Sequence, residues 1–241
     1  MQSKRWFVLS LFCSSCTSLY IPTVRNVPLF SGKGDFQGTV SIGNGLNVQA
    51  AYSPFRHLAV AVTGLAANNK RVPQFAYRTH QSAEFALGYY TKGRFPFEIF
   101  GGYGTGRGEG RDSSLSIIFF PSALETAAGQ YNKYFLQPTI GLNRKRLQYA
   151  LSVRLSYVDF KSISLATNNH PEEVEKRPIY FLEPSFTFKF FTTRRPTCVF
   201  IFAQAGLNLP MGNPDDIFFR YSILHYNVGV GVRIKHKVDQ D

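Results

Sequence analysis

The sequence predicts an antiparallel, up-and-down transmembrane β-barrel of about ten strands, with short periplasmic turns and long outer loops. Three observations support this fold class: apolar residues recur at every second position, short and long connections alternate, and the N-terminus has the features of an export signal. Although 44% of the residues are hydrophobic, the mean hydropathy is −0.13. Apolar residues spread over alternate positions form a lipid-facing surface that a hydropathy average does not detect.

The first elements in the chain concern export. Residues 1–15 have the pattern of a signal peptide, in which Lys4 and Arg5 precede an apolar stretch at 6–12. Small residues and then Cys16 follow, which resembles a bacterial lipoprotein signal whose cysteine is acylated and becomes the first mature residue. A plain secretory signal cut nearby is the alternative, and it leads to the same compartment.

Residues 16–34 contain two prolines, two glycines and no periodicity. We expect an extended tether that follows a lipidated Cys16 and contacts the inner rim of the barrel. No run of acidic residues comes after Cys16. Its absence favours an anchor in the inner leaflet, facing the periplasm.

The barrel itself is expected over 35–237, with 238–241 as a short tail. The clearest part is 136–160, where a basic turn at 143–146 joins two strands. After the turn, apolar and polar residues alternate for eleven residues from Leu147 to Tyr157, about the length that crosses a bilayer at a tilt. The other eight strands are expected near 35–42, 46–53, 57–67, 82–90, 94–103, 179–191, 199–209 and 225–235.

Connection lengths alternate along this series of strands. The short connections are 54–56, 92–93, 143–146 and 192–197, and the long ones are 68–81, 104–130, 161–178 and 210–224. Tight periplasmic turns and large outer loops are typical of outer-membrane barrels. An even number of strands would place both termini in the periplasm, where the lipid anchor is also expected.

The charge of the chain follows the same division. The net charge is +12, but an exported chain would rarely meet nucleic acid, so we expect no nucleic-acid partner. A basic rim at the periplasmic end could meet anionic phospholipid headgroups or an acidic periplasmic protein, although solvated turns also favour Lys and Arg. The predicted rim comprises Arg56, Lys92, Arg94, Arg144, Lys145, Arg146, Arg194 and Arg195.

Alternation alone does not show which face of the barrel looks outward. A soluble ligand-binding barrel would turn its apolar face inward, whereas strand length, aromatic residues near strand ends and the signal favour a membrane barrel. The lumen then receives three carboxylates and three cations, which we expect to pair because unpaired buried charges are costly. This lumen network is Glu84, Glu98, Arg154, Glu183, Lys189 and Arg233. The alternative is that these residues line a small pore.

The chain shows no catalytic motif. Candidates for an outer-rim enzyme fit no known spacing. Residues 213–216 are interpreted as a solvated turn in preference to a calcium site. We therefore expect no catalytic residue, metal or cofactor. The candidates considered are His80, Asp159, His170, Asp215 and His225.

Cys16 with its preceding signal, the tether, and strand patterns such as that of 97–103 (FEIFGGY) resemble small lipidated β-barrel proteins of Gram-negative outer membranes. The resemblance implies a location and an architecture more firmly than an activity. Our leading hypothesis is a non-enzymatic outer-membrane lipoprotein that is a structural or accessory subunit of an envelope assembly. Outer-membrane lipid and an envelope protein are its expected partners. A narrow channel or small-ligand-binding barrel is the alternative, and a surface enzyme is the third reading.

Overall fold

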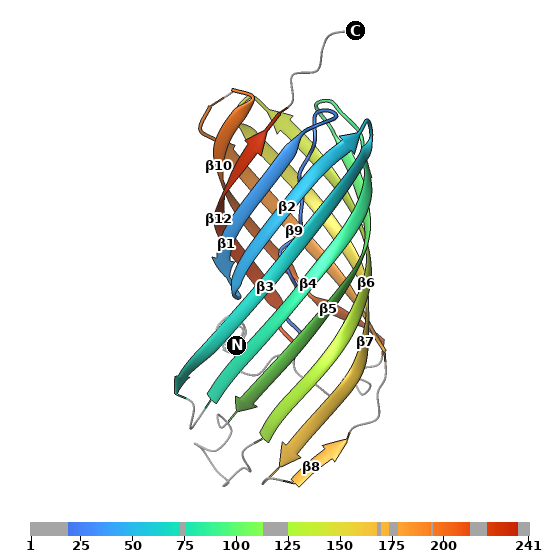
Figure 1. The fold of residues 1–241 in the computed structure, drawn as a ribbon, viewed down its shortest axis with the longest axis vertical. Coiled ribbons are helices and arrows are strands. Elements are labelled where there is room, and N and C mark those ends of the chain that lie inside the picture. Colours follow the sequence, from blue (N-terminus) through green and yellow to red (C-terminus); the bar gives the residue numbers. More distant parts are fainter. Residues whose placement is uncertain are drawn as a thin grey trace, which may run out of the picture.

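Antiparallel strands make up most of the computed structural model, which describes residues 19–72, 76–112, 125–167, 170–173, 178–193, 195–212 and 221–235 (Figure 1). No helix in these residues is long and apolar enough to cross a membrane. The strands are β1 Phe36–Gly43, β2 Leu46–Phe55, β3 Leu58–Val72, β4 Ala76–Tyr90, β5 Phe97–Asp112, β6 Glu125–Arg144, β7 Leu147–Thr167, β8 His170–Glu173, β9 Ile179–Phe191, β10 Thr197–Leu207, β11 Leu209–Met211 and β12 Leu224–Ile234.

Ten of these strands close into one barrel, which confirms the predicted fold class. Each long strand pairs antiparallel with its neighbours. β7 is hydrogen-bonded to β9, and β12 closes the barrel on β1 through pairs such as Phe36 with Ile234. The short strands β8 and β11 pair only at the margins of β7 and β9. Closure leaves no unpaired edge in the body of the barrel, as a lipid environment requires.

The two ends of the barrel differ. The tight connections after β2, β4, β6 and β9 gather at the end where the chain leaves β12, which we call the short-turn end (upper end of Figure 1). At the opposite, long-strand end, β3 to β7 extend well past the β1–β2 hairpin. They are longer than predicted: residues 68–72, 76–81, 104–112, 125–130 and 161–167 were expected in loops but belong to β3, β4, β5, β6 and β7 respectively.

Close packing explains why the glycine-rich part of β5 is a strand and not a loop. Its even-numbered glycines face the inside of the barrel, where large side chains occupy the space that a Cβ would need. A Cβ at Gly106 would lie 2.4 Å from the ring of Tyr131, and one at Gly102 would lie 2.4 Å from the ring of Phe135. Glycine in a strand often marks such a close approach.

The side chains sort by polarity between the two faces of the wall. Leu151, Phe186 and Val230 point outward and are 55%, 49% and 55% exposed, whereas Arg154 and Lys189 point inward and are buried. An apolar exterior around a polar interior is the arrangement of a barrel that spans lipid. The assignment of apolar residues to the outer face and polar residues to the lumen is therefore confirmed. The alternative of a soluble barrel with an apolar interior is wrong.

Candidate functional site: the filled lumen

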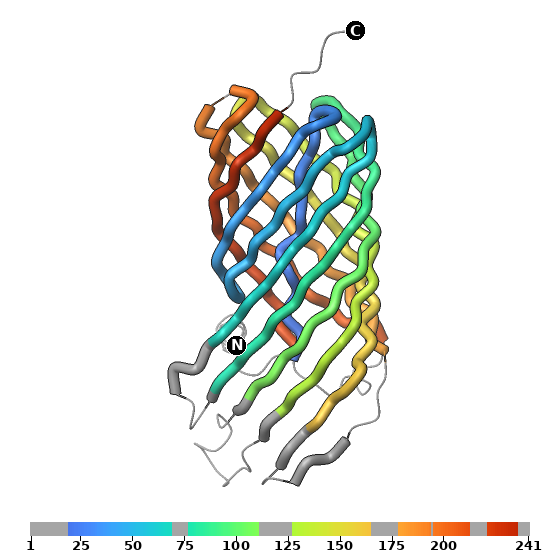
Figure 2. Tube along the Cα trace, viewed as in Figure 1, coloured from blue at the N-terminus to red at the C-terminus, as the bar shows by residue number. Residues whose placement is uncertain are grey.

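The interior of the barrel is occupied by the chain's own N-terminal part. Every residue of 19–30, which we call the internal segment, is buried, and it runs extended inside the wall from the long-strand end to the short-turn end (blue in Figure 2). The sequence analysis expected this stretch to be a tether that contacts the inner rim of the barrel. In the structure, the segment contacts the inner wall along the whole length of the lumen.

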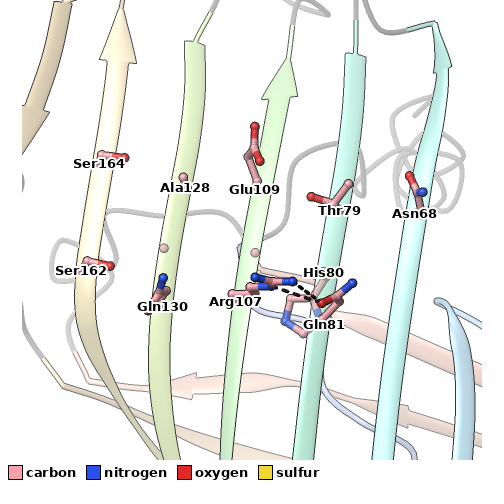
Figure 3. Close-up of a pocket in the computed structure, with 12 residues that line it drawn as sticks. Asn68, Thr79, His80, Gln81, Arg107, Glu109, Ala128, Gln130, Ser162 and Ser164 are labelled. Carbon is pink, nitrogen blue, oxygen red and sulfur yellow. Dashed lines mark hydrogen bonds between the residues drawn. The ribbon is translucent and has the colours of Figure 1, made fainter.

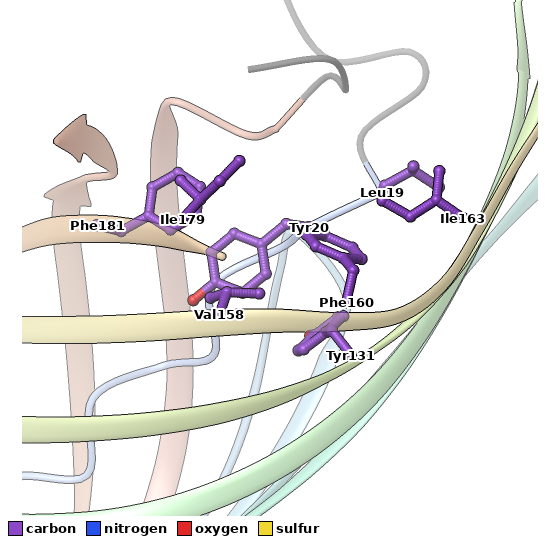
Figure 4. Close-up of a cluster of buried hydrophobic side chains, with 8 residues drawn as sticks. All are labelled: Leu19, Tyr20, Tyr131, Val158, Phe160, Ile163, Ile179 and Phe181. Atoms are coloured by element: carbon purple, nitrogen blue, oxygen red, sulfur yellow. The ribbon is translucent and has the colours of Figure 1, made fainter. Parts of the chain in front are cut away.

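Aromatic packing holds the segment at the long-strand end. Tyr20 forms a parallel bridge with Tyr221, and the Ser222 amide donates to the Tyr20 carbonyl at 3.2 Å. The Tyr20 ring stacks on Phe181 with centroids 4.9 Å apart and meets Tyr131 edge-on at 5.4 Å. Figure 4 shows these rings together in one buried cluster between the segment and the wall.

Charged and polar groups hold the middle of the segment. The Thr23 hydroxyl donates to Glu84 at 2.7 Å, and the Arg25 guanidinium forms an ion pair with Glu183 at 2.9 Å. Both side chains of that pair are fully buried. The Gln204 side chain accepts from the Arg25 amide at 2.8 Å and donates to the Arg25 carbonyl at 3.1 Å, as a neighbouring strand would.

Amide side chains of the wall also satisfy the segment's backbone. Gln49 donates to the Val24 carbonyl at 2.7 Å, and Gln137 donates to the Asn26 carbonyl at 2.9 Å. Buried backbone groups without partners cost as much as lost hydrogen bonds. An extended segment with no ladder partner in the lumen therefore depends on these inward glutamines.

The segment ends against the short-turn end. Phe30 packs on Tyr90 with ring centroids 5.5 Å apart, and its amide donates to Glu98 at 3.2 Å. The chain then turns through 31–35, where the Gly34 amide donates to the Ser53 carbonyl at 2.7 Å, and enters β1. The internal pass is thus continuous with the first strand of the wall.

Part of the predicted lumen network forms a cluster around one carboxylate. Glu84 contacts both Lys133 and Arg154, the latter at 3.1 Å. Arg154 also donates to Gln137 at 2.7 Å and lies over the Phe135 ring at 4.3 Å. This multiple pairing is the kind of compensation that buried charges need.

The other predicted lumen residues have different partners. Lys189 donates to the Val27 carbonyl of the internal segment and to Gln37 at 2.9 Å. Arg233, near the short-turn end, lies over the Phe191 ring at 3.7 Å. Of the six predicted residues, Glu84, Arg154 and Glu183 take part in ion pairs, while Glu98 and Lys189 bind the segment's backbone.

Sequence reasoning missed two cations of the lumen. Lys133 continues the inward alternation of β6 by one more step before Phe135, so extending that pattern would have found it. Arg25 lies in an aperiodic stretch, and no sequence signal marked it. Lys133 pairs with Glu84, and Arg25 pairs with Glu183.

The predicted basic rim lies at the short-turn end and is exposed to solvent. Cys16 and Arg194 lie outside the described residues, as do 1–15 and 238–241. The rim residues that the structure describes there are Arg56, Lys92, Arg94, Arg144, Lys145, Arg146 and Arg195.

The catalytic candidates whose side chains the structure describes, His80, Asp159 and His225, form no common site. His80 and His225 face the lumen and are buried, while Asp159 is on the outward face of β7. Asp215 lies outside the described residues, and within the described ranges no three His, Cys, Asp or Glu side chains form a metal-binding group. A cavity beside Asn26 and Arg154 measures about 10 Å³, barely enough for one water.

A second hollow lies on the polar outer face of the strands that extend past the barrel. It has a volume of about 460 Å³ and spans β3 to β7 at the long-strand end (Figure 3). Arg107 points into this region and donates to Gln81 at 2.7 and 3.2 Å. Polar residues replace the apolar exterior at this height, so this part of the wall suits water or polar headgroups better than hydrocarbon.

The first and last described residues lie at opposite ends of the barrel. Leu19 is in the cluster at the long-strand end, whereas the Lys235 amide donates to the Pro196 carbonyl at the short-turn end. The expectation that both ends share one side counted ten strands. The internal segment adds one more pass, giving eleven, and an odd number of passes places the two ends of the described chain, Leu19 and Lys235, at opposite ends of the barrel.

No protein-family model matches the sequence, and no curated protein matches it. Among solved structures, the translocator domain of autotransporter NalP from Neisseria meningitidis is similar to this barrel. The TM-score is 0.49, the sequence identity is 12%, and the match covers 84% of this chain and 87% of that chain. This likeness does not identify a function for the chain.

Proposed function

We propose that the protein is a non-conducting outer-membrane β-barrel lipoprotein, acylated at Cys16, that is a structural or accessory subunit of an envelope assembly. The observation that carries the proposal is the filled lumen. Residues 19–30 are buried from end to end inside the wall, and side chains of the wall bind their backbone. A barrel whose lumen is occupied in this way is expected not to conduct solutes.

The surfaces left for function are therefore at the two ends. The exposed basic rim at the short-turn end carries seven described Lys or Arg side chains, a charge that attracts acidic groups on a periplasmic protein or on phospholipid. The polar outer face at the long-strand end is the second surface. Binding at the ends suits a subunit that joins other envelope components.

Planar-bilayer recording tests the closed lumen. The full chain should insert without stable conductance steps, while a variant lacking residues 19–30, if it folds, should conduct. Regular ion-selective steps from the full chain would overturn the closed barrel and favour the channel.

Co-purification after mild crosslinking tests the accessory role. We expect the full chain to bring down a stable envelope protein, and replacement of Arg144 and Arg146 by Glu to remove it. The matched control replaces Arg144 and Arg146 by Lys, which keeps the charge of the rim and should leave the complex intact. A chain that purifies only as a monomer, with no retained protein, would contradict this role. Incorporation of labelled palmitate, lost in Cys16→Ser, tests the acylation separately.

A further inference from the structure

The direction of the internal segment determines where the chain enters the barrel. Tyr20 is fixed at the long-strand end by its bridge to Tyr221 and its stacking on Phe181. Ten residues later, Phe30 is fixed at the short-turn end against Tyr90 and Glu98. The chain therefore passes from the long-strand end to the short-turn end before its first strand begins.

The wall is shaped to receive the start of this pass. The Leu19 carbonyl lies so close to Gly108 of β5 that a Cβ there would be 2.5 Å away. Leu19 and Tyr20 pack together with Phe160 and Ile163 of the extended β7. The long strands thus extend past the β1–β2 hairpin where they cover the entering chain, which a segment resting only on the periplasmic rim would not require.

The segment is also long enough to cross the membrane. Its twelve residues, 19 to 30, span roughly 40 Å when extended at about 3.3 Å each, against a hydrocarbon core about 30 Å thick. The ion pair of Arg25 with Glu183 and the hydrogen bond of Thr23 with Glu84 lie within this crossing. The charges are paired inside the wall and shielded from lipid.

We propose that the chain is threaded outward through its own barrel, so that the residues before Leu19 are displayed at the outer face while the C-terminal end stays in the periplasm. This rests on the outer-membrane placement in the proposed function, with the short turns facing the periplasm as is general for such barrels. Cys16 is three residues before Leu19, within about 11 Å even if the chain is fully extended. An acyl group on Cys16 then belongs to the outer leaflet and not to the inner one.

Three epitope insertions in otherwise intact chains test the topology on whole cells. One tag follows Thr17, a second lies in the β5–β6 connection at 113–124, and a third follows Asp241. We expect antibody to bind the first two tags on intact cells and to reach the third only after the outer membrane is permeabilised. A tag at 17 that behaves like the tag at 241, while the tag at 113–124 is accessible, would overturn the threading.

The second tag separates the possible failures. If the tag at 113–124 is hidden and the tag at 241 is accessible on intact cells, the barrel is inserted the other way round, and the outward display is wrong. Threading itself is then read from a disulfide between Tyr20→Cys and Tyr221→Cys, which forms only if the segment lies in the lumen. Conductance tests the closed lumen of the proposed function independently of the tags. If the full chain does not conduct and the tag at 17 is inaccessible on intact cells, the outward threading is contradicted and the closed lumen is not.

Discussion

Removing the cation of the buried Arg25 and Glu183 pair should destabilise the protein severely. The two charged groups are 2.9 Å apart and neither side chain is exposed, so the solvent screening that weakens surface ion pairs does not apply. Arg25→Met leaves the buried Glu183 carboxylate without its cation, while it still accepts a hydrogen bond from the Tyr20 hydroxyl at 2.6 Å. Breaking a buried pair on one side typically costs about 3 to 5 kcal/mol, and we expect a loss of this size.

The assay is equilibrium unfolding in urea of the barrel reconstituted in lipid vesicles, together with conductance. Glu183→Gln added to Arg25→Met should recover much of the loss, because the uncompensated charge is then gone. Arg56→Met, an exposed residue of a short turn, is the control and should change the free energy of unfolding by less than about 0.5 kcal/mol. If Arg25→Met is as harmless as the control, or if the double variant is no more stable than the single one, the segment is not bound as described.

Three further changes test other parts of the account. Gly106→Val should cost about 1 to 3 kcal/mol because its Cβ meets the Tyr131 ring, whereas Gly64→Val, with no atom within 4 Å, should fold normally; equal heat-induced gel shifts would refute this. Val230→Arg on the outer face should lower stability by about 2 to 4 kcal/mol in bilayers, and no change would contradict a lipid-facing position. Neutralising the turn at 144–146 with Gln should weaken binding to anionic vesicles by about 1 kcal/mol per charge in co-sedimentation at low salt, and unchanged binding would exclude lipid as the partner of the rim.

The barrel could be predicted from the sequence because the pattern that specifies it lies within each strand. Alternate residues of a strand face opposite sides, so the order of Leu151, Ser152, Val153 and Arg154 alone assigns lipid and lumen. The strand boundaries found in this way also define the lengths of the connections. Together they predicted ten strands and one end of the barrel with short turns. The extensions of β5 and β6 were missed because glycine and alanine carry little alternation.

The filling of the lumen by residues 19–30 could not be predicted from the sequence in the same way. The segment from 19 to 30 is extended without pairing to a strand ladder, so it has no period, and its prolines and polar residues are those of a solvated linker. What holds it is the complementary placement of Gln49, Gln137 and Gln204 from three distant strands. Strand alternation can place these glutamines on the inward face, but their partner inside the barrel could be found only in three dimensions.

Disulfide trapping of the internal segment tests the central claim most directly. In a chain whose native cysteines are replaced by serine, Tyr20→Cys paired with Tyr221→Cys should crosslink rapidly on mild oxidation, because the two backbones form a bridge. Tyr20→Cys paired with Arg56→Cys, at the other end of the barrel, should not crosslink. Efficient crosslinking of the distant pair, or none of the bridged pair in the folded barrel, would contradict a lumen filled by the chain's own N-terminal segment.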